Sequence, residues 1–575
     1  MKNTHLLAIF MMGILLSFFH SGSVQAVNLN DVEALEETNR CEYCDFSEAA
    51  FRGRSLRRKR VRGSDFTSAN LSHGDLRNSD FREAIFFEAD LRAADLTGVK
   101  LAGADFRGAI VDERTLMSDR WRWIWQLANE GGASGDFSGM DLSDAAFIEG
   151  AFESANFAGT NLEDTNFLSA NLSEANLSGA NLKDTNFDNA NLSGANLSGT
   201  DLSGTNLWAT NLSGANLSGT NLAKAKLWRT NLRGSTIDEN TVFDEPWDLV
   251  WEITNNGAVG KDLAEADLES LNFEGADFTD ANLQNADLDE TVLSRANLAR
   301  VNLEGAKLRS AILDEANLTD ANLFDTKLYS IVLIDANLQG ANLENTDFSP
   351  PRGATKTERL LALSLNVVSA ITSTLAIAEA LNIAADTGDF PRYLAEALTS
   401  VGQNALPNPA RVSLNIVNDS RADLSGANFQ SSNLANSDLQ GTVLLETNLS
   451  GANLTGANLS PTIDPLSGLK VFTILVNANL TQATLTDANL TKVWLAKADL
   501  SQSQLVNADL HEAKLLQANL QGANLQGANL TGADLTDANL TDADLTDANL
   551  ESAIFCRTLM PDGTQADQGC GESDE

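Results

Sequence analysis

Large apolar side chains recur at every fifth position along most of this chain, as Leu172, Leu177 and Leu182 illustrate. A small residue usually lies two positions before each of them, and Asn or Asp lies one position before. A helix places apolar residues about every 3.6 positions and a strand every second position, so neither element explains this period. If the large and the small residue both point inward, the chain must turn a corner within every five residues. The outward positions are rich in Gly, Asn, Asp and Ser, which are typical of tight turns.

Two sets of phenylalanines indicate how many corners close one coil. Within each set the residues are spaced by twenty: Phe46, Phe66, Phe86 and Phe106, and then Phe147, Phe167 and Phe187. Twenty residues are four pentapeptides, so a coil with four sides stacks each ring on the ring one turn below it. The spacing therefore predicts a coil of square cross-section.

Breaks in the period of five divide the chain into repeat blocks and inserts. The sequence predicts repeat blocks at 46–111, 137–237, 263–348, 424–459 and 475–555. Inserts are predicted between these blocks, at 112–136, 238–262, 349–423 and 460–474. An N-terminal cap is predicted at 27–45, and a C-terminal cap or tail at 556–575.

The first two inserts are copies of each other. Each carries two tryptophans four residues apart, Trp121 and Trp125 in the first and Trp247 and Trp251 in the second. This spacing places both rings on one face of a short helix. We interpret that face as a cover for the apolar side of the neighbouring coil. An aromatic platform for a sugar or a peptide is the alternative.

The third insert, 349–423, has a different composition. Residues 360–378 carry no charge and predict a helix, and a second helix is predicted from Pro391. The apolar run approaches the roughly 20 residues of a membrane span. Polar residues interrupt it, however, and a single span would place the two halves of the repeat array in different compartments. We therefore favour a helical hairpin packed on the solenoid over membrane insertion.

The repeated unit, Ala followed by Asn or Asp, then Leu and two outward residues, resembles the motif of the pentapeptide-repeat family. Its central position matches residues such as Leu520 and Leu525, and its small position matches Ala518 and Ala523. This resemblance covers most of the chain. It implies an all-β solenoid, a right-handed quadrilateral β-helix, with short helical inserts in this chain. It implies much less about function, because one fold serves many functions.

The N-terminus has the pattern of a secretory signal peptide. Lys2 precedes an apolar stretch from Leu6 to Phe19, and the small-residue pattern that ends at Ala26 is typical of a cleavage site. We predict a signal peptide over 1–26, with an uncleaved anchor as the lesser alternative. The protein is then exported, either periplasmic or secreted, or lumenal if its source is a photosynthetic bacterium.

Four cysteines lie near the two ends of the chain: Cys41, Cys44, Cys556 and Cys570. Export makes disulfides plausible. About twenty coils spaced by roughly 4.8 Å make a long rod, whereas bridged Cα atoms lie within about 7 Å of each other. Pairs within each end are therefore favoured. A redox-active pair is the alternative for Cys41 and Cys44.

Charge and histidine content exclude several classes of function. The formal net charge is −40, so phosphates are repelled and ordinary nucleic-acid binding is excluded. After the predicted cleavage only His73 and His511 remain, in different blocks, so no histidine-based catalytic arrangement or metal cluster can form. The repeat spreads its carboxylates over a convex surface rather than a cleft. We expect no enzymatic activity, no cofactor and no metal.

Outward aromatic residues are the best candidates for an interaction site, because the repeat requires none. Trp208 and Trp228 both follow a central leucine and are twenty residues apart, so we expect them on one outer face. Three basic residues are close in sequence: Lys224, Lys226 and Arg229. We expect the second insert to fold back over the two rings. If the rings are exposed instead, they are the strongest anchors for a partner.

Basic residues cluster at the start of the first block, from Arg52 to Arg62. Arg54 and Lys59 occupy the position that normally holds a small inward side chain, so we expect the first full coil to begin only after Gly63. We interpret the cluster as a solvated cap. A patch for anionic lipid, or for the acidic flank of another molecule, is the alternative.

These features favour an exported, non-catalytic scaffold that binds an unidentified protein partner in the cell envelope. Contact with a membrane surface is a further hypothesis. The family resemblance offers a DNA-mimic inhibitor as an alternative, because some cytosolic members present an acidic rod to a topoisomerase. A third hypothesis is an envelope carbohydrate-binding module that uses the tryptophans named above.

Overall fold

A computed structural model of the protein describes residues 29–349, 422–463 and 470–570. The predicted signal peptide and nearly all of the predicted helical hairpin lie outside the described residues. The chain divides into two compact units. The first comprises residues up to Leu207 with Leu217–Ala225 and Asp238–Thr241, and the second comprises Trp208–Asn216, Lys226–Ile237 and the chain from Val242 onward.

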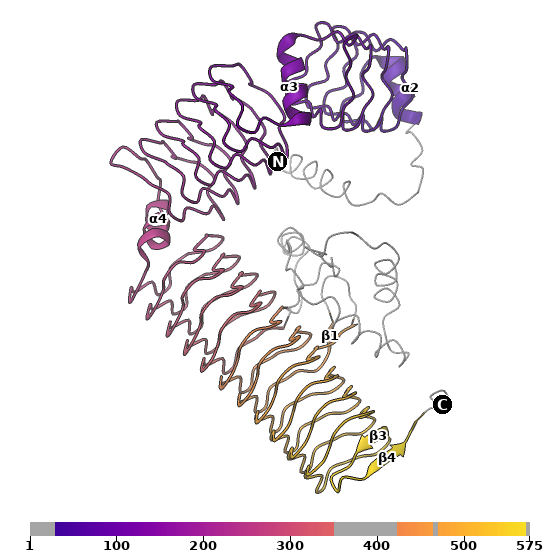
Figure 1. Ribbon diagram of the computed structural model, residues 1–575, viewed down its shortest axis with the longest axis vertical. Coiled ribbons are helices and arrows are strands. Elements are labelled where there is room, and N and C mark those ends of the chain that lie inside the picture. Colours follow the sequence, from indigo (N-terminus) through magenta and orange to yellow (C-terminus); the bar gives the residue numbers. More distant parts are fainter. Residues whose placement is uncertain (1–28, 350–421, 464–469, 571–575) are drawn as a thin grey trace. The chain divides into compact units, whose positions relative to one another are not determined.

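Both units are built from successive coils of the chain (Figure 1). Within a repeat block, the residue before a central position typically forms a parallel β-bridge with the residue twenty positions later, as Asn156 does with Asn176. Between sides the chain turns, and the amide of Ala170 donates to the carbonyl of Phe167 at 3.0 Å. Ser169, in the same turn, has a φ of 56°. A positive φ at this position explains why Gly, Asn, Asp and Ser dominate the outward positions.

The predicted stacking of phenylalanines along the core is confirmed. The ring centroids of Phe66 and Phe86 are 5.6 Å apart, and those of Phe86 and Phe106 are 5.4 Å apart. In the next block the rings of Phe167 and Phe187 are 5.5 Å apart and nearly parallel, at 2°. All these rings are fully buried. The four-sided coil inferred from the period of twenty is therefore the fold of this chain.

In the described residues, three helices accompany the coils: α2 (Leu29–Thr38), α3 (Asp119–Glu130) and α4 (Trp247–Asn256). Helix α2 caps the start of the described chain, and α3 and α4 lie in the first two inserts (Figure 1). The tryptophan spacing in these inserts thus correctly indicated helices. Among the residues that the structure describes, no helix has the length and apolar character needed to cross a membrane.

The first two inserts share their local structure as well as their sequence. Asn129 in α3 donates from Nδ2 to a coil carbonyl at 2.9 Å, and Asn255 in α4 donates to the equivalent carbonyl at 3.2 Å. Each helix is followed by a glycine with positive φ, 73° at Gly131 and 78° at Gly257. The repeated insert is therefore a repeated structural unit that docks on the preceding coil.

In the second unit, the coils keep their register across the later inserts. Val332 forms a parallel bridge with Asp423, so the third insert leaves one coil and the chain returns to the next without a change of stacking. The fourth insert leaves and returns as an antiparallel pair, β1 (Thr462–Ile463) with β2 (Lys470–Val471). The last coil ends in a second antiparallel pair, β3 (Phe555–Leu559) with β4 (Gln565–Gln568).

The expectation that the first full coil begins after Gly63 is wrong. Parallel bridges begin at Arg40, which pairs with Arg60. The two charged residues that occupy small-residue positions, Arg54 and Lys59, therefore belong to a formed coil. They are tolerated because this coil is the first, and its outer end meets helix α2 instead of another coil.

Helix α2 satisfies both of these charged side chains. Lys59 Nζ donates to the carbonyl of Leu35 at 2.8 Å and to Oδ1 of Asn39 at 2.7 Å. Arg54 forms an ion pair with Glu36 at 2.6 Å. Cations near the last turn of a helix interact favourably with its unpaired carbonyls. Lys59 and Arg54 thus fasten the N-terminal cap to the first coil.

Candidate interaction surface

An aromatic corner forms in the second unit where the second insert meets the coils. Trp228 follows the central Leu227 and is 46% exposed. Trp247, the first residue of α4, is buried, and its ring meets that of Trp228 edge to face, with centroids 6.0 Å apart and planes at 89°. The insert therefore folds back on Trp228, as expected, but leaves nearly half of this side chain in contact with solvent.

The other predicted insert tryptophans serve mainly to hold the helices on the coils. Trp251 Nε1 donates to Ser235 Oγ at 3.1 Å, and Trp125 Nε1 donates to the carbonyl of Ala109 at 2.7 Å. Trp121 packs against the core of the first unit. Because these rings are partly buried and Trp247 is buried, the two pairs do not form an open aromatic platform. They act as the cover that the sequence favoured.

Arg229, one of the three basic residues named with the two tryptophans, has a buried side chain, at 8% exposure. Its Nη2 donates to the carbonyl of Glu290 at 3.0 Å, and the carboxylate of Glu290 lies 3.8 Å away. The Nε of Arg229 has no hydrogen-bond partner among the residues that the structure describes. Burial lowers the pKa of Arg229, and the charge of Glu290 acts in the opposite direction. Arg229 is thus a buried and incompletely partnered cation beneath the corner.

Glu269 adds a negative charge beside Trp228. The amide of Arg229 donates to the carbonyl of Ser270 at 2.8 Å, which places Trp228 and Glu269 next to each other on consecutive coils. Glu269 is exposed, and no described residue forms an ion pair or hydrogen bond with its carboxylate. Partial burial raises the pKa of Glu269, and neighbouring carboxylates, Asp287 first among them, act in the same direction.

We define the Trp228 corner as Trp228, Trp247, Arg229, Glu269 and Glu290. An indole face attracts Lys and Arg side chains, and a carboxylate forms strong hydrogen bonds with them. Within the described part of the chain Glu269 forms no ion pair, so a cationic side chain from another molecule would relieve the repulsion among the neighbouring carboxylates. The corner is therefore chemically suited to bind a lysine or an arginine.

The remaining predicted candidates are more dispersed. The amide of Ala209 donates to the carbonyl of Trp228 at 2.9 Å, which places Trp208 and Trp228 on consecutive coils as expected. Trp208 is partly buried and Lys226 is exposed, both within the second unit. Lys224 is exposed but belongs to the first unit.

Sequence reasoning missed two exposed residues, Glu269 and Trp123. Glu269 is not twenty residues from Trp228, because the second insert intervenes, so reading the chain at intervals of twenty passes over it. The sequence feature that could have identified Glu269 is its position directly after the central Leu268, when the residues of the insert are left out of the count. Trp123 lies in α3 and is 49% exposed.

Both cysteine pairs are joined within their own end of the chain. Cys41 and Cys44 form one disulfide with a Cα–Cα distance of 5.7 Å, and Cys556 and Cys570 form the other at 4.8 Å. These are the local pairs that the rod geometry favoured. The second disulfide holds the β3–β4 pair closed at the end of the solenoid.

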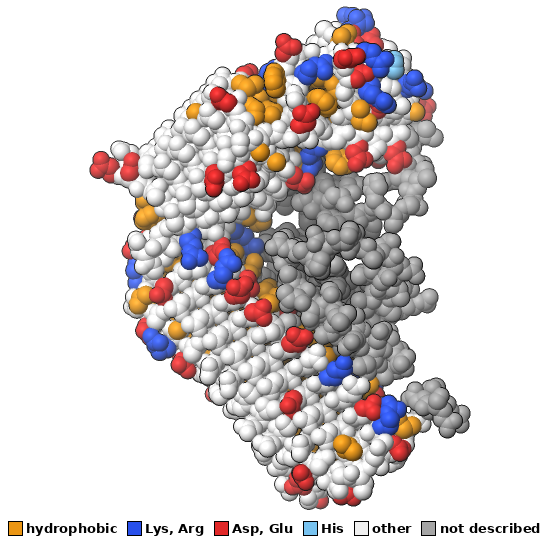
Figure 2. All heavy atoms as spheres, viewed as in Figure 1, with side chains coloured by type: hydrophobic (Ala, Val, Ile, Leu, Met, Phe, Trp, Pro, Cys, Tyr) orange, Lys and Arg blue, Asp and Glu red, His pale blue; other side chains and the backbone are white. Residues whose placement is uncertain are grey.

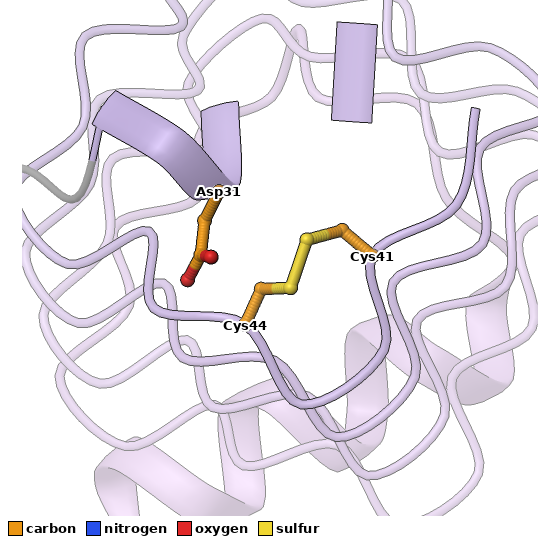
Figure 3. A group of neighbouring side chains, drawn as sticks. All are labelled: Asp31, Cys41 and Cys44. Atoms are coloured by element: carbon orange, nitrogen blue, oxygen red, sulfur yellow. A yellow bond between two sulfur atoms is a disulfide. The ribbon is translucent and has the colours of Figure 1, made fainter. Parts of the chain in front are cut away.

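Asp31 lies beside the first disulfide and could suggest a metal site (Figure 3). Its carboxylate and the sulfurs of Cys41 and Cys44 lie within 4.8 Å of one another. The two sulfurs are bonded to each other, however, so neither is a thiolate that could ligate a metal. Asp31 instead accepts a hydrogen bond from the amide of Asp45 at 2.9 Å. This group therefore ties α2 to the first coil.

The sequence profile described as Pentapeptide repeats (8 copies) matches more than half of the chain, at residues 44–83, 84–112, 170–208, 200–237, 262–295, 292–328, 311–349, 422–460, 472–502, 503–542 and 523–560. The chain belongs to the pentapeptide-repeat family. The coils of this pentapeptide-repeat protein are accordingly a right-handed quadrilateral β-helix. Members of the family are generally non-catalytic scaffolds.

Several solved pentapeptide-repeat structures are similar to this chain. HetL of the cyanobacterium Nostoc sp. strain PCC 7120, involved in heterocyst differentiation regulation, is 25% identical over 53% of this chain and 91% of its own, with a TM-score of 0.28. A protein of the Arabidopsis thaliana thylakoid lumen is 32% identical over 15% of this chain and 63% of its own, with a TM-score of 0.14. QnrB1, a plasmid-mediated fluoroquinolone resistance protein, is 16% identical over 45% of this chain and 82% of its own, with a TM-score of 0.17. No curated protein matches the chain significantly.

Proposed function

We propose that this protein is an exported, non-catalytic scaffold that binds another protein of the cell envelope through the Trp228 corner. The observation that carries the proposal is the half-exposed indole of Trp228, braced by buried Trp247 and adjacent to the unpaired carboxylate of Glu269. Protein interfaces concentrate their binding energy in a few such anchors, with Trp and Arg foremost. The partner would present a lysine or an arginine at the corner.

Export is supported by the two ends of the chain. The N-terminal pattern is that of a signal peptide, and disulfides persist in oxidising compartments such as the periplasm, the extracellular space or an organelle lumen. An acidic protein with a net charge of −40 would also attract a basic partner over a longer range than contact, which accelerates association.

The test compares partners recovered with wild-type protein and with the Trp228→Ser variant from an envelope extract. Serine is a common residue at this repeat position, so the coil is preserved. Trp123→Ser is the matched control, because it removes an indole of similar exposure, 49% against 46%. We expect the same partner with wild type and control, and at least about thirtyfold weaker binding with Trp228→Ser, as for a hot-spot residue worth about 2 kcal/mol.

Other results would contradict the proposal. Equal recovery with both variants would show that Trp228 is not an anchor. If a polysaccharide bound the protein and this binding required Trp228, the ligand of the corner would be an envelope carbohydrate and not a protein. Retention of a fluorescent fusion in the cytosol would contradict export and would favour the DNA-mimic alternative.

A further inference from the structure

Most arginines of the first unit that follow a central residue are neutralised by an aspartate two positions earlier. Arg77, for example, donates from Nε and Nη2 to the two carboxylate oxygens of Asp75, at 2.8 and 2.7 Å. The same pairing with the preceding aspartate occurs at Arg82, Arg92 and Arg107, and Arg114 in the first insert pairs with Asp112 in the same way. Such two-point pairs satisfy the guanidinium group locally. These arginines therefore offer little free charge to another molecule.

The first coil breaks this rule. The three arginines that follow a central residue here, Arg52, Arg57 and Arg62, are not preceded by aspartate, because Ala50, Ser55 and Arg60 occupy the aspartate position. Of these three, Arg62 pairs with Glu83 instead. Arg57, Arg58 and Arg60 are exposed, and their side chains form no hydrogen bond or ion pair with any described residue. The coil thus presents three guanidinium groups within four residues of sequence that form no hydrogen bond or ion pair with a described residue, although the charge of Arg57 acts on the neighbouring Asp75.

An exposed aromatic residue lies at the other end of the same side of the coil. Tyr43 is 56% exposed, and its amide donates to the carbonyl of Arg62 at 2.9 Å. Its ring lies over Gly63, where a Cβ atom would be 2.4 Å from the nearest ring carbon. Glycine therefore makes room for the ring. We define the arginine edge as Arg57, Arg58, Arg60 and Tyr43.

Several nearby acidic side chains of the cap are already engaged with other partners. Glu36 pairs with Arg54, and Glu42 pairs with Arg40. Asp31 accepts the amide of Asp45. Figure 2 shows Lys and Arg side chains over the first coils, at the indigo end of Figure 1, with Asp and Glu side chains among them, whereas long stretches of the repeat surface in this view carry no charge.

We propose that the arginine edge binds the anionic surface of a membrane. Guanidinium groups match lipid phosphates in geometry and charge, and exposed tyrosines favour the headgroup region. Clusters of basic residues bind anionic leaflets. The acidic remainder of the solenoid weakens this little, because charges beyond a Debye length of about 8 Å are screened at physiological salt. This contact is separate from the Trp228 corner, so either site can fail without the other.

The test is cosedimentation of the full chain with vesicles, either of phosphatidylcholine alone or of phosphatidylcholine mixed with phosphatidylglycerol. One triple variant carries Arg57→Ser, Arg58→Asn and Arg60→Asn. The matched control carries Arg77→Ser, Arg82→Ser and Arg92→Ser, which removes the same number of charges from arginines that are already paired. Far-ultraviolet circular dichroism and thermal melting verify that all three proteins fold alike.

We expect wild type and control to bind the anionic vesicles and to ignore the neutral ones. Each edge arginine contributes roughly fivefold to binding, so the edge variant should bind roughly a hundredfold more weakly. Equal weakening in both triple variants would overturn the proposal, as would wild-type binding that is equal on neutral vesicles. Binding to polyglutamate through the same arginines, without binding to vesicles, would instead assign the edge to an acidic protein.

Discussion

The period of five makes an unusually sharp prediction about two adjacent phenylalanines. Phe86 occupies a central position and is fully buried. Phe87 is the next residue, points outward and is only partly buried. We predict that Phe86→Ala strongly destabilises the coils around it, whereas Phe87→Ala has a small effect. Because the two phenylalanines are joined by a single peptide bond, each alanine variant serves as the control for the other.

The structure supplies the magnitudes. Phe86 contacts three phenylalanine rings, those of Phe66, Phe81 and Phe106, at centroid distances of 5.6, 5.4 and 5.4 Å. Removing a buried phenylalanine costs about 3–5 kcal/mol. Phe86→Leu, which restores the commonest central residue, should cost less than about 1.5 kcal/mol. Phe87→Ala loses mainly the contact with the Arg107 guanidinium, 5.7 Å from the ring centroid, worth about 0.5–1 kcal/mol.

Hydrogen exchange measured by mass spectrometry is the appropriate assay. A repeat array opens locally, so one global free energy of unfolding is not well defined. Exchange in peptides from the first block reports local opening free energies directly. Equal loss of protection in Phe86→Ala and Phe87→Ala would refute the assignment of inward and outward positions, and with it the square coil.

Three further predictions concern the caps and the paired charges. Hydrogen bonds from Arg77 lower the pKa of Asp75 from 3.8 to about 2. The ionised pair therefore stabilises the folded coil above about pH 4, and this contribution is lost as the pH falls toward 2. The Arg77→Gln variant should accordingly lose less exchange protection than wild type between about pH 4 and pH 2. Replacing Cys556 and Cys570, which are 14 residues apart, with serine should destabilise the β3–β4 pair by about 3 kcal/mol, and limited proteolysis should then cleave the C-terminal end first. Lys59→Ala should remove two hydrogen bonds to the end of α2, a loss of about 1–3 kcal/mol, and faster exchange confined to residues 29–40 would confirm it.

The repeat geometry could be predicted from the sequence because each coil uses the same local rule. A large inward residue, a small inward residue and a turn with positive φ suffice to position Phe86 against Phe66 and Phe106. No long-range information is needed, since each coil contacts mainly its neighbours. The first two inserts could likewise be predicted to share one structure, because their sequences are copies of each other and each docks on its neighbouring coil.

Prediction failed where the environment departs from an interior coil. Arg54 and Lys59 looked incompatible with a full coil, because the sequence alone did not reveal that α2 would cover the first coil and accept their charges. Arg229 was an interaction candidate with Lys224 and Lys226, but it is buried next to Glu290, a residue of the coils that follow the second insert. In both cases contacts that the period of five does not encode determine the surroundings of a residue inside the repeat.

The central functional claim is that Trp228 contacts a protein partner outside the cytoplasm. Its most direct test places a photo-crosslinking amino acid at position 228, and in a second strain at Ser198, which occupies the equivalent repeat position on another coil. Illumination of intact cells should give a discrete adduct with one envelope protein from position 228 and none from position 198. The absence of any adduct at 228, the same adducts at both positions, or adducts with cytosolic proteins would contradict the account.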